Sequence, residues 1–139
     1  MAFLSRLFHP FNREPLQRLA KDETRAQAEW QLLKQKLRRK IKDPQQRIRL
    51  ETWGTQLFDK LRENYHRVDA VLTNKNPQEK DRTELLLEKL EQSCDDLLNT
   101  FPVRRRRMTQ GQKWQKRVIN RIKDHIELLD YLLFEMEES

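Results

Sequence analysis

The chain has 139 residues, of which 36% are apolar and 37% are charged, and its formal net charge is +7. This length predicts one domain, and the low apolar content predicts a narrow core. Two glycines and five prolines are too few for an all-β chain with many hairpins, whereas the abundant Leu, Lys, Arg, Glu and Gln favour long helices. The positive charge favours partners that are polyanions or anionic surfaces.

The cysteine content, the apolar runs and the N-terminus of the sequence are used to predict the cellular compartment. The single cysteine, Cys94, excludes an internal disulfide and fits a reducing compartment. No apolar run approaches the roughly 20 residues that a membrane-spanning helix needs. The N-terminus is too short and too interrupted for a signal peptide. We therefore expect a cytoplasmic protein.

Residues 1–11 form a separate amphipathic segment that ends at Pro10. Its apolar side chains share one face of a short helix: Phe3, Leu4, Leu7 and Phe8. The pattern is compatible with a flap over the end of the fold, a peptide that docks on a protein partner, a peripheral contact with an anionic membrane, or disorder. A segment this short binds a membrane only marginally without a second attachment.

Four amphipathic stretches follow, each with apolar residues at helical spacing. We expect helices at about 13–42, 44–73, 77–101 and 109–137. Asp43 and Asn76 each precede a proline that suits the first position of a helix, and Gln46 can complete a capping box with Asp43. The last helix is expected to start around Thr109, with Gln112 three residues later. Four amphipathic helices with short connections predict an all-α, antiparallel four-helix bundle with up-down-up-down topology over residues 12–139.

Some details of this bundle stay open in the sequence. The break at Asp43-Pro44 is short, so one continuous helix kinked at the proline is an alternative to a hairpin. Gly54 lies inside the second helix and indicates either close helix packing or a bend. Three apolar residues lie off the apolar faces of their predicted helices: Leu32, Phe58 and Val71. A homo-oligomer that forms through one helical face therefore remains an alternative to a monomer.

Catalytic and metal-binding patterns are absent from the sequence. The three histidines are scattered, and we expect His66 and His125 at the boundary of the core. One cysteine cannot build the usual Cys/His metal set, and there is no glycine-rich phosphate loop. Cys94 is expected in the core. The sequence therefore predicts a protein that is not an enzyme and that uses no cofactor and no metal.

Positive charge gathers in two segments. Residues 34–51 hold eight basic and two acidic residues, and residues 102–117 hold seven basic and no acidic residues. In an up-down-up-down bundle the first and third turns lie at the same end. The bundle would then have a basic pole with a net charge of +13 and a body with a net charge of −6.

The arginine run in the third turn is the strongest indication of function. It precedes the N-terminus of a helix, where the helix dipole disfavours cations, and its like charges repel one another. Binding to a polyanion would neutralise them; the alternative is a solvated face. The candidate contacts are Arg104, Arg105, Arg106, Arg107, Lys113, Lys116, Arg117, Arg38 and Arg39. Trp114 could stack on an unpaired base, but its register with Val118 and Ile122 favours the core.

These patterns predict a small, non-catalytic accessory or adaptor protein that binds nucleic acid through its basic pole. The contacts would be to the phosphate backbone, with low sequence specificity and strong salt dependence. DNA, RNA, anionic lipid and an acidic protein surface are not distinguished. The alternative is a protein–protein or membrane-proximal adaptor in which Phe3, Leu4, Leu7 and Phe8 make the contacts.

Overall fold

The structure is a computed structural model that describes residues 13–138. This part of the chain forms four long helices and one short 3-10 turn, with no strand. The elements are α2 (Arg13–Lys40), α3 (Pro44–Asn74), α4 (Pro77–Leu98), η2 (Arg105–Arg107) and α5 (Gln110–Glu138). None of these helices is long and apolar enough to cross a membrane. The predicted amphipathic segment, with Phe3, Leu4, Leu7 and Phe8, lies outside the described residues.

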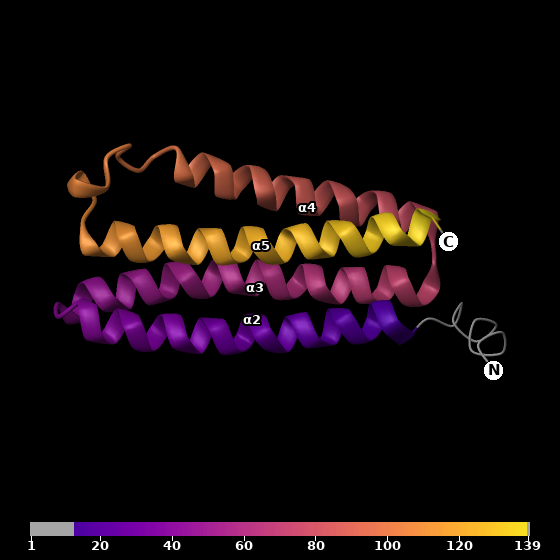
Figure 1. Cartoon of the computed structure of the whole chain (residues 1–139), viewed down its shortest axis with the longest axis horizontal. Helices are drawn as coiled ribbons and strands as arrows, with labels where there is room; N and C mark the ends of the chain where they lie inside the picture. Colours follow the sequence, from indigo (N-terminus) through magenta and orange to yellow (C-terminus); the bar gives the residue numbers. More distant parts are fainter. Residues whose placement is uncertain (1–12, 139) are drawn as a thin grey trace.

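The helices form an antiparallel up-down-up-down bundle, as the sequence predicts (Figure 1). The chain leaves α2 after Lys40 and enters α3 at Pro44, so the connection is a hairpin and not a kink in one helix. The turn between α2 and α3 and the loop between α4 and α5 lie at the same end of the bundle. This topology brings the two basic segments to one end.

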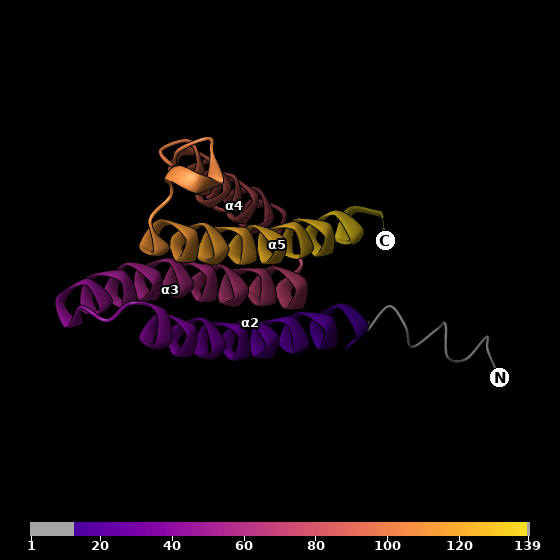
Figure 2. The same cartoon turned by 60° about the vertical axis from the view of Figure 1, so that its left-hand side comes forward.

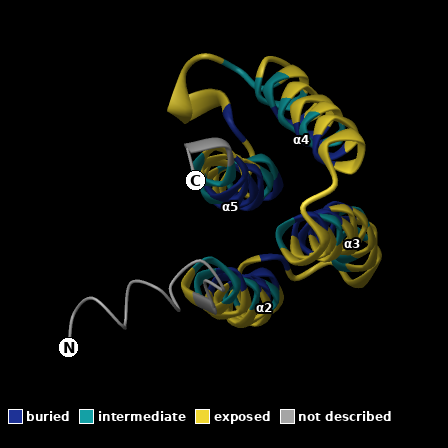
Figure 3. Ribbon diagram, turned by 90° about the vertical axis from the view of Figure 1, so that its right-hand side faces the viewer, coloured by how far each residue is buried: buried dark blue, intermediate teal, exposed yellow. Residues whose placement is uncertain are grey.

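The centre of the bundle is the pair of α3 and α5. These two helices pack against each other, and each also packs along α2 and along α4. Viewed along the helices, α2 and α4 lie on opposite sides of that pair, and the buried residues face inward (Figure 3). The interior therefore depends most on α5, which contributes Trp114, Val118, Ile119, Ile122, Ile126, Leu129, Leu132 and Leu133.

Two of the three residues placed off the main stripes belong to the core. Phe58 and Val71 are buried, whereas Leu32 is 63% exposed. The prediction is wrong for Phe58 and Val71 because α3 contacts three helices and therefore buries a wider face than one stripe. Leu32 lies on the outer face of α2.

Local capping signals set the helix starts. The Asp43 carboxylate accepts from the backbone N–H of Gln45 at 3.1 Å. Thr109 and Gln112 bond each other's backbone N–H groups reciprocally, at 3.0 and 3.1 Å, and this capping box starts the last helix near Thr109, as the sequence predicts. The α4 helix ends at Leu98, three residues before the predicted end. It ends early because the backbone N–H of Thr100 bonds the carbonyl of Leu97, a tighter turn that stops the helix.

Gly54 allows close packing of aromatic rings. Trp30 of α2 stacks on Phe58 with ring centroids 4.8 Å apart and lies 6.0 Å from the ring of Trp114. A Cβ atom at position 54 would lie only 2.5 Å from the Cη2 atom of Trp30. Gly54 therefore marks a close helix contact, and α3 continues through it without interruption.

We expect Gly54→Ala to lower the free energy of unfolding by about 1–3 kcal/mol, because rigid indole rings must shift to admit the methyl group. Better helix propensity offsets about 1 kcal/mol of that cost. Gly111→Ala is the matched control, since its Cβ would meet the Gln46 side chain at 3.2 Å and the Cδ1 atom of Leu50 at 3.3 Å, both less close than the Trp30 ring at position 54. Urea denaturation of both variants tests this, and equal losses would contradict it.

Candidate functional site

A pocket of about 400 Å³ opens at the end of the bundle where α2 ends and α5 begins. Its walls come from the last turns of α2, from the loop between α4 and α5, and from the first turns of α5. Six of its lining side chains are basic and none is acidic. The six are Lys36, Lys40, Arg105, Lys113, Lys116 and Arg117.

Helical spacing explains why these cations converge. Lys113, Lys116 and Arg117 fall three and four residues apart and share one face of α5. Lys36 and Lys40 share a face of α2 in the same way. Because α2 and α5 pack side by side, the two faces adjoin at this end of the bundle.

Trp114 joins α2 to α5 beneath the pocket. Its indole N–H donates to the backbone carbonyl of Leu33 at 2.8 Å, and the residue is only 4% exposed. The core interpretation is therefore confirmed. Stacking of an unpaired base on Trp114 is excluded by this burial.

The loop between α4 and α5 presents the arginine run to solvent. Arg104 precedes the 3-10 turn of Arg105–Arg107, and all four arginines are exposed. Met108 is buried directly after them and anchors the loop to the bundle. Figure 2 shows the loop standing out from the bundle before the chain enters α5. Within residues 13–138 no carboxylate pairs with any of the four.

The structure brings together only part of the predicted site. Four predicted residues line the pocket: Arg105, Lys113, Lys116 and Arg117. Arg104, Arg106 and Arg107 lie exposed in the adjoining loop without lining it. Arg38 instead lies 3.7 Å from Glu51 of α3, and Arg39 is exposed outside the pocket. Lys36 and Lys40, which the prediction omitted from the site, take their place.

The side of the bundle formed by α4 is acidic. Asp130 of α5 shows this most clearly, because burial and the neighbouring Glu91, Glu84 and Glu88 of α4 raise its pKa to about 6. Lys123 of α5 lies 2.5 Å from Asp95 of α4 and offsets part of this charge. Positive and negative charge are therefore separated within one small bundle.

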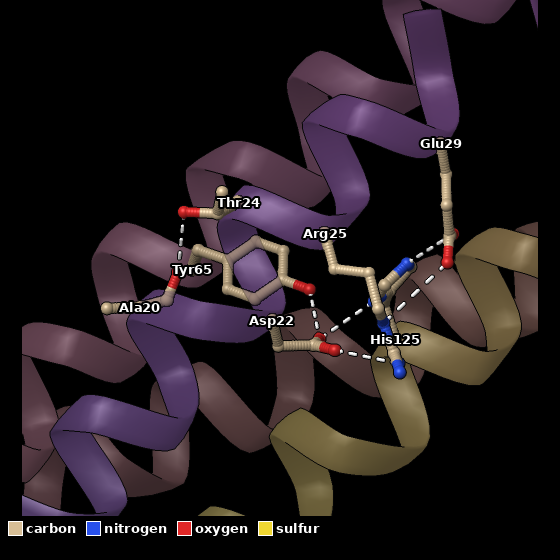
Figure 4. Close-up of polar contacts among 7 residues, drawn as sticks. All are labelled: Ala20, Asp22, Thr24, Arg25, Glu29, Tyr65 and His125. Carbon is tan, nitrogen blue, oxygen red and sulfur yellow. Dashed lines mark hydrogen bonds and ion pairs between the residues drawn. The ribbon is translucent and has the colours of Figure 1, made fainter. Parts of the chain in front are cut away.

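A second polar cluster is buried between α2, α3 and α5 (Figure 4). The His125 Nδ1 atom lies 2.7 Å from the carboxylate of Asp22, and its Nε2 atom lies 2.8 Å from that of Glu29. The Tyr65 hydroxyl donates to the Asp22 carboxylate. Arg25, on the outside of α2, lies 2.9 Å from Asp22 and 3.6 Å from Glu29.

This geometry holds His125 in its charged form. A carboxylate can only accept a hydrogen bond, so both imidazole nitrogens must donate. Burial alone would lower the pKa of His125, but the hydrogen bonds to Asp22 and Glu29 outweigh it and raise the pKa above 6.5. Burial would raise the pKa of Asp22, but hydrogen bonds from His125 and Tyr65 hold it below 3.8. The two carboxylates, His125 and Arg25 together carry no net charge.

This cluster was not predicted from the sequence. His125 is 1% exposed, so its prediction as a boundary residue is wrong. The sequence did contain an indication of it. Asp22 follows Leu19 by three residues and precedes Ala26 by four, so it lies on the apolar face of its helix. His125 has the same spacing from Ile122 and Leu129. A carboxylate and a histidine that both occupy core register positions indicate a buried pair.

The buried cluster lies in the interior of the bundle, away from solvent. Asp22, Tyr65 and His125 are all at least 95% buried, so solvent barely reaches the imidazole. Among the described residues no group of three or more His, Cys, Asp or Glu side chains could hold a metal ion. Cys94 is fully buried, as predicted, and burial raises the pKa of its thiol to about 11.

Comparison of the chain with protein-family models, with curated proteins and with solved structures finds no match. The function must therefore be inferred from the charges and geometry of the chain itself.

Proposed function

We propose that the protein is a non-catalytic accessory protein that binds nucleic acid through the basic end of its helical bundle. The supporting observation is the pocket in which α2, α5 and the intervening loop present six basic side chains and no acidic one. Arginine and lysine are the side chains that contact phosphate oxygens most effectively. Contacts of this kind bind the backbone and read little sequence.

The arginine loop supports the same proposal. Arg104 to Arg107 stand next to the pocket, exposed and without a carboxylate partner among the described residues. A phosphate backbone that passes over the pocket would neutralise them. The acidic side formed by α4 would repel the same backbone, so charge alone would direct nucleic acid to one end of the bundle.

Binding to labelled single- and double-stranded DNA and RNA, measured by fluorescence anisotropy across a salt series, tests the proposal. We expect affinity to fall steeply between about 50 and 200 mM salt. Replacing Arg104 to Arg107 with alanine should weaken binding to all sequences and flatten the slope of log affinity against log salt. Each lost phosphate contact should reduce that slope by about 0.7–0.9.

A charge-matched control distinguishes the effect of the basic site from the effect of lower net charge. A variant with four exposed cations outside the pocket replaced by alanine removes the same number of charges: Lys21, Lys60, Arg62 and Lys89. We expect its salt slope to stay close to that of the wild type. No binding at low salt, or equal slopes for the two quadruple variants, would contradict the proposal.

A further inference from the structure

The shape of the basic pocket limits which part of a nucleic acid can enter it. It is a half-open concavity of about 400 Å³, within the size range of small-ligand sites. The phosphates of a duplex lie on the outside of a stiff cylinder, which can touch the rim of such a pocket but cannot fill it. A strand end, in contrast, can project into it.

The charges around the pocket favour an end for a second reason. A phosphate inside a strand carries one negative charge, whereas a terminal phosphate carries about 1.5–2 and has three free acceptor oxygens. Lys36 and Lys40 on the α2 wall, with Lys113 and Arg117 on the α5 wall, surround the space from two sides. A group with more charge and more acceptors gains more from cations on two walls than a backbone phosphate that passes over them.

The rest of the lining suits the nucleotide that carries such a phosphate. Gln110 and Asn120 supply side-chain amides that can bond to the sugar or base, and the exposed Val103 supplies apolar surface.

We propose that this pocket binds the terminal phosphate of a nucleic-acid strand, while the arginine loop binds the backbone that leads to it. This inference rests on the proposed function, because it assigns the two parts of the basic end to two parts of the same ligand. The pocket side chains would then give specificity for the strand end, whereas the loop side chains would only add affinity.

The test compares three short single-stranded oligonucleotides of one sequence that carry a 5′-phosphate, a 3′-phosphate or hydroxyls at both ends. At one fixed ionic strength, we expect at least one phosphorylated end to bind about 10-fold more tightly than the hydroxyl form, the effect of an added charged hydrogen-bonded contact. Lys113→Ala with Arg117→Ala should remove this preference.

Arg104→Ala with Arg106→Ala is the matched control, because it removes two charges from the loop and none from the pocket. It should weaken all three oligonucleotides by a similar factor and keep the preference for a phosphorylated end. Helical circular dichroism checks that both variants are folded. Equal affinity for the three oligonucleotides overturns this inference and leaves the proposed function standing, whereas binding to none of them overturns both.

Discussion

Replacing His125 with alanine is expected to lower the free energy of unfolding by about 3–5 kcal/mol, the usual cost of removing one partner of a buried ion pair. Asp22 would keep its bond from Tyr65 and its ion pair with Arg25, but it would lose the imidazolium that neutralises it. Glu29 would also lose its buried partner. Urea denaturation followed by circular dichroism measures the loss.

The chain supplies a matched control for this substitution. His66 is exposed on α3, so His66→Ala should change the free energy of unfolding by no more than about 0.5 kcal/mol. Asp22→Asn removes the charge on the other side of the pair. The double variant with His125→Ala should lose less than the two single losses combined, with a coupling of about 0.5–3 kcal/mol. Equal effects of His66→Ala and His125→Ala would refute the assignment.

The contribution of this cluster to the stability of the wild type is expected to be largest between pH 3.8 and pH 6.5. Folding raises the pKa of His125, so its contribution is complete below 6.5 and is lost as the pH rises through the raised value. Folding lowers the pKa of Asp22, so its contribution is complete above 3.8 and is lost as the pH falls through the lowered value. Each unit of pKa change contributes about 1.4 kcal/mol.

Urea denaturation across a pH series that extends beyond both values measures this profile. The His125→Ala variant should lack the alkaline decline, and Asp22→Asn should lack the acidic one. His66→Ala should keep both, because its side chain is in solvent in the folded and unfolded states. An alkaline decline of wild-type size in His125→Ala would show that another group controls the profile.

The buried cluster and the basic pocket lie along the same contact between α2 and α5. Asp22 and Glu29 meet His125 partway along this contact, and nearer the basic end the Trp114 N–H bonds the carbonyl of Leu33. Both interactions fix how far one helix is shifted and rotated relative to the other. They therefore also fix the position of the two walls that carry the pocket lysines.

The fold could be predicted from the sequence because its signals are local. Asp43 and Thr109 cap helices through atoms only two or three residues away, so the sequence alone places those helix starts. The end of α4 was predicted three residues too late, since it depends on a bond from the Thr100 N–H to the Leu97 carbonyl. Helix spacing also groups Lys113, Lys116 and Arg117 on one face without any knowledge of the tertiary structure.

The choice among the cations of α2 could not be predicted in the same way. Lys36, Arg38, Arg39 and Lys40 are near one another in sequence, yet only the two lysines line the pocket. Which face of α2 adjoins α5 depends on the rotation of one helix about its axis. Contacts between residues far apart in the chain set that rotation, among them the bond from the Trp114 N–H to the Leu33 carbonyl and the contacts of His125 with Asp22 and Glu29.

The sequence by itself determined the four helices, their order and the placement of positive charge near two turns, because caps, prolines and apolar spacing act over a few residues. Only the tertiary structure decided that Lys36 and Lys40 face the first turns of α5 and that the loop adds Arg105 to them. Only the tertiary structure placed His125 between Asp22 and Glu29. These arrangements join residues far apart in the chain, and they depend on the relative shift and rotation of packed helices, which no local pattern specifies.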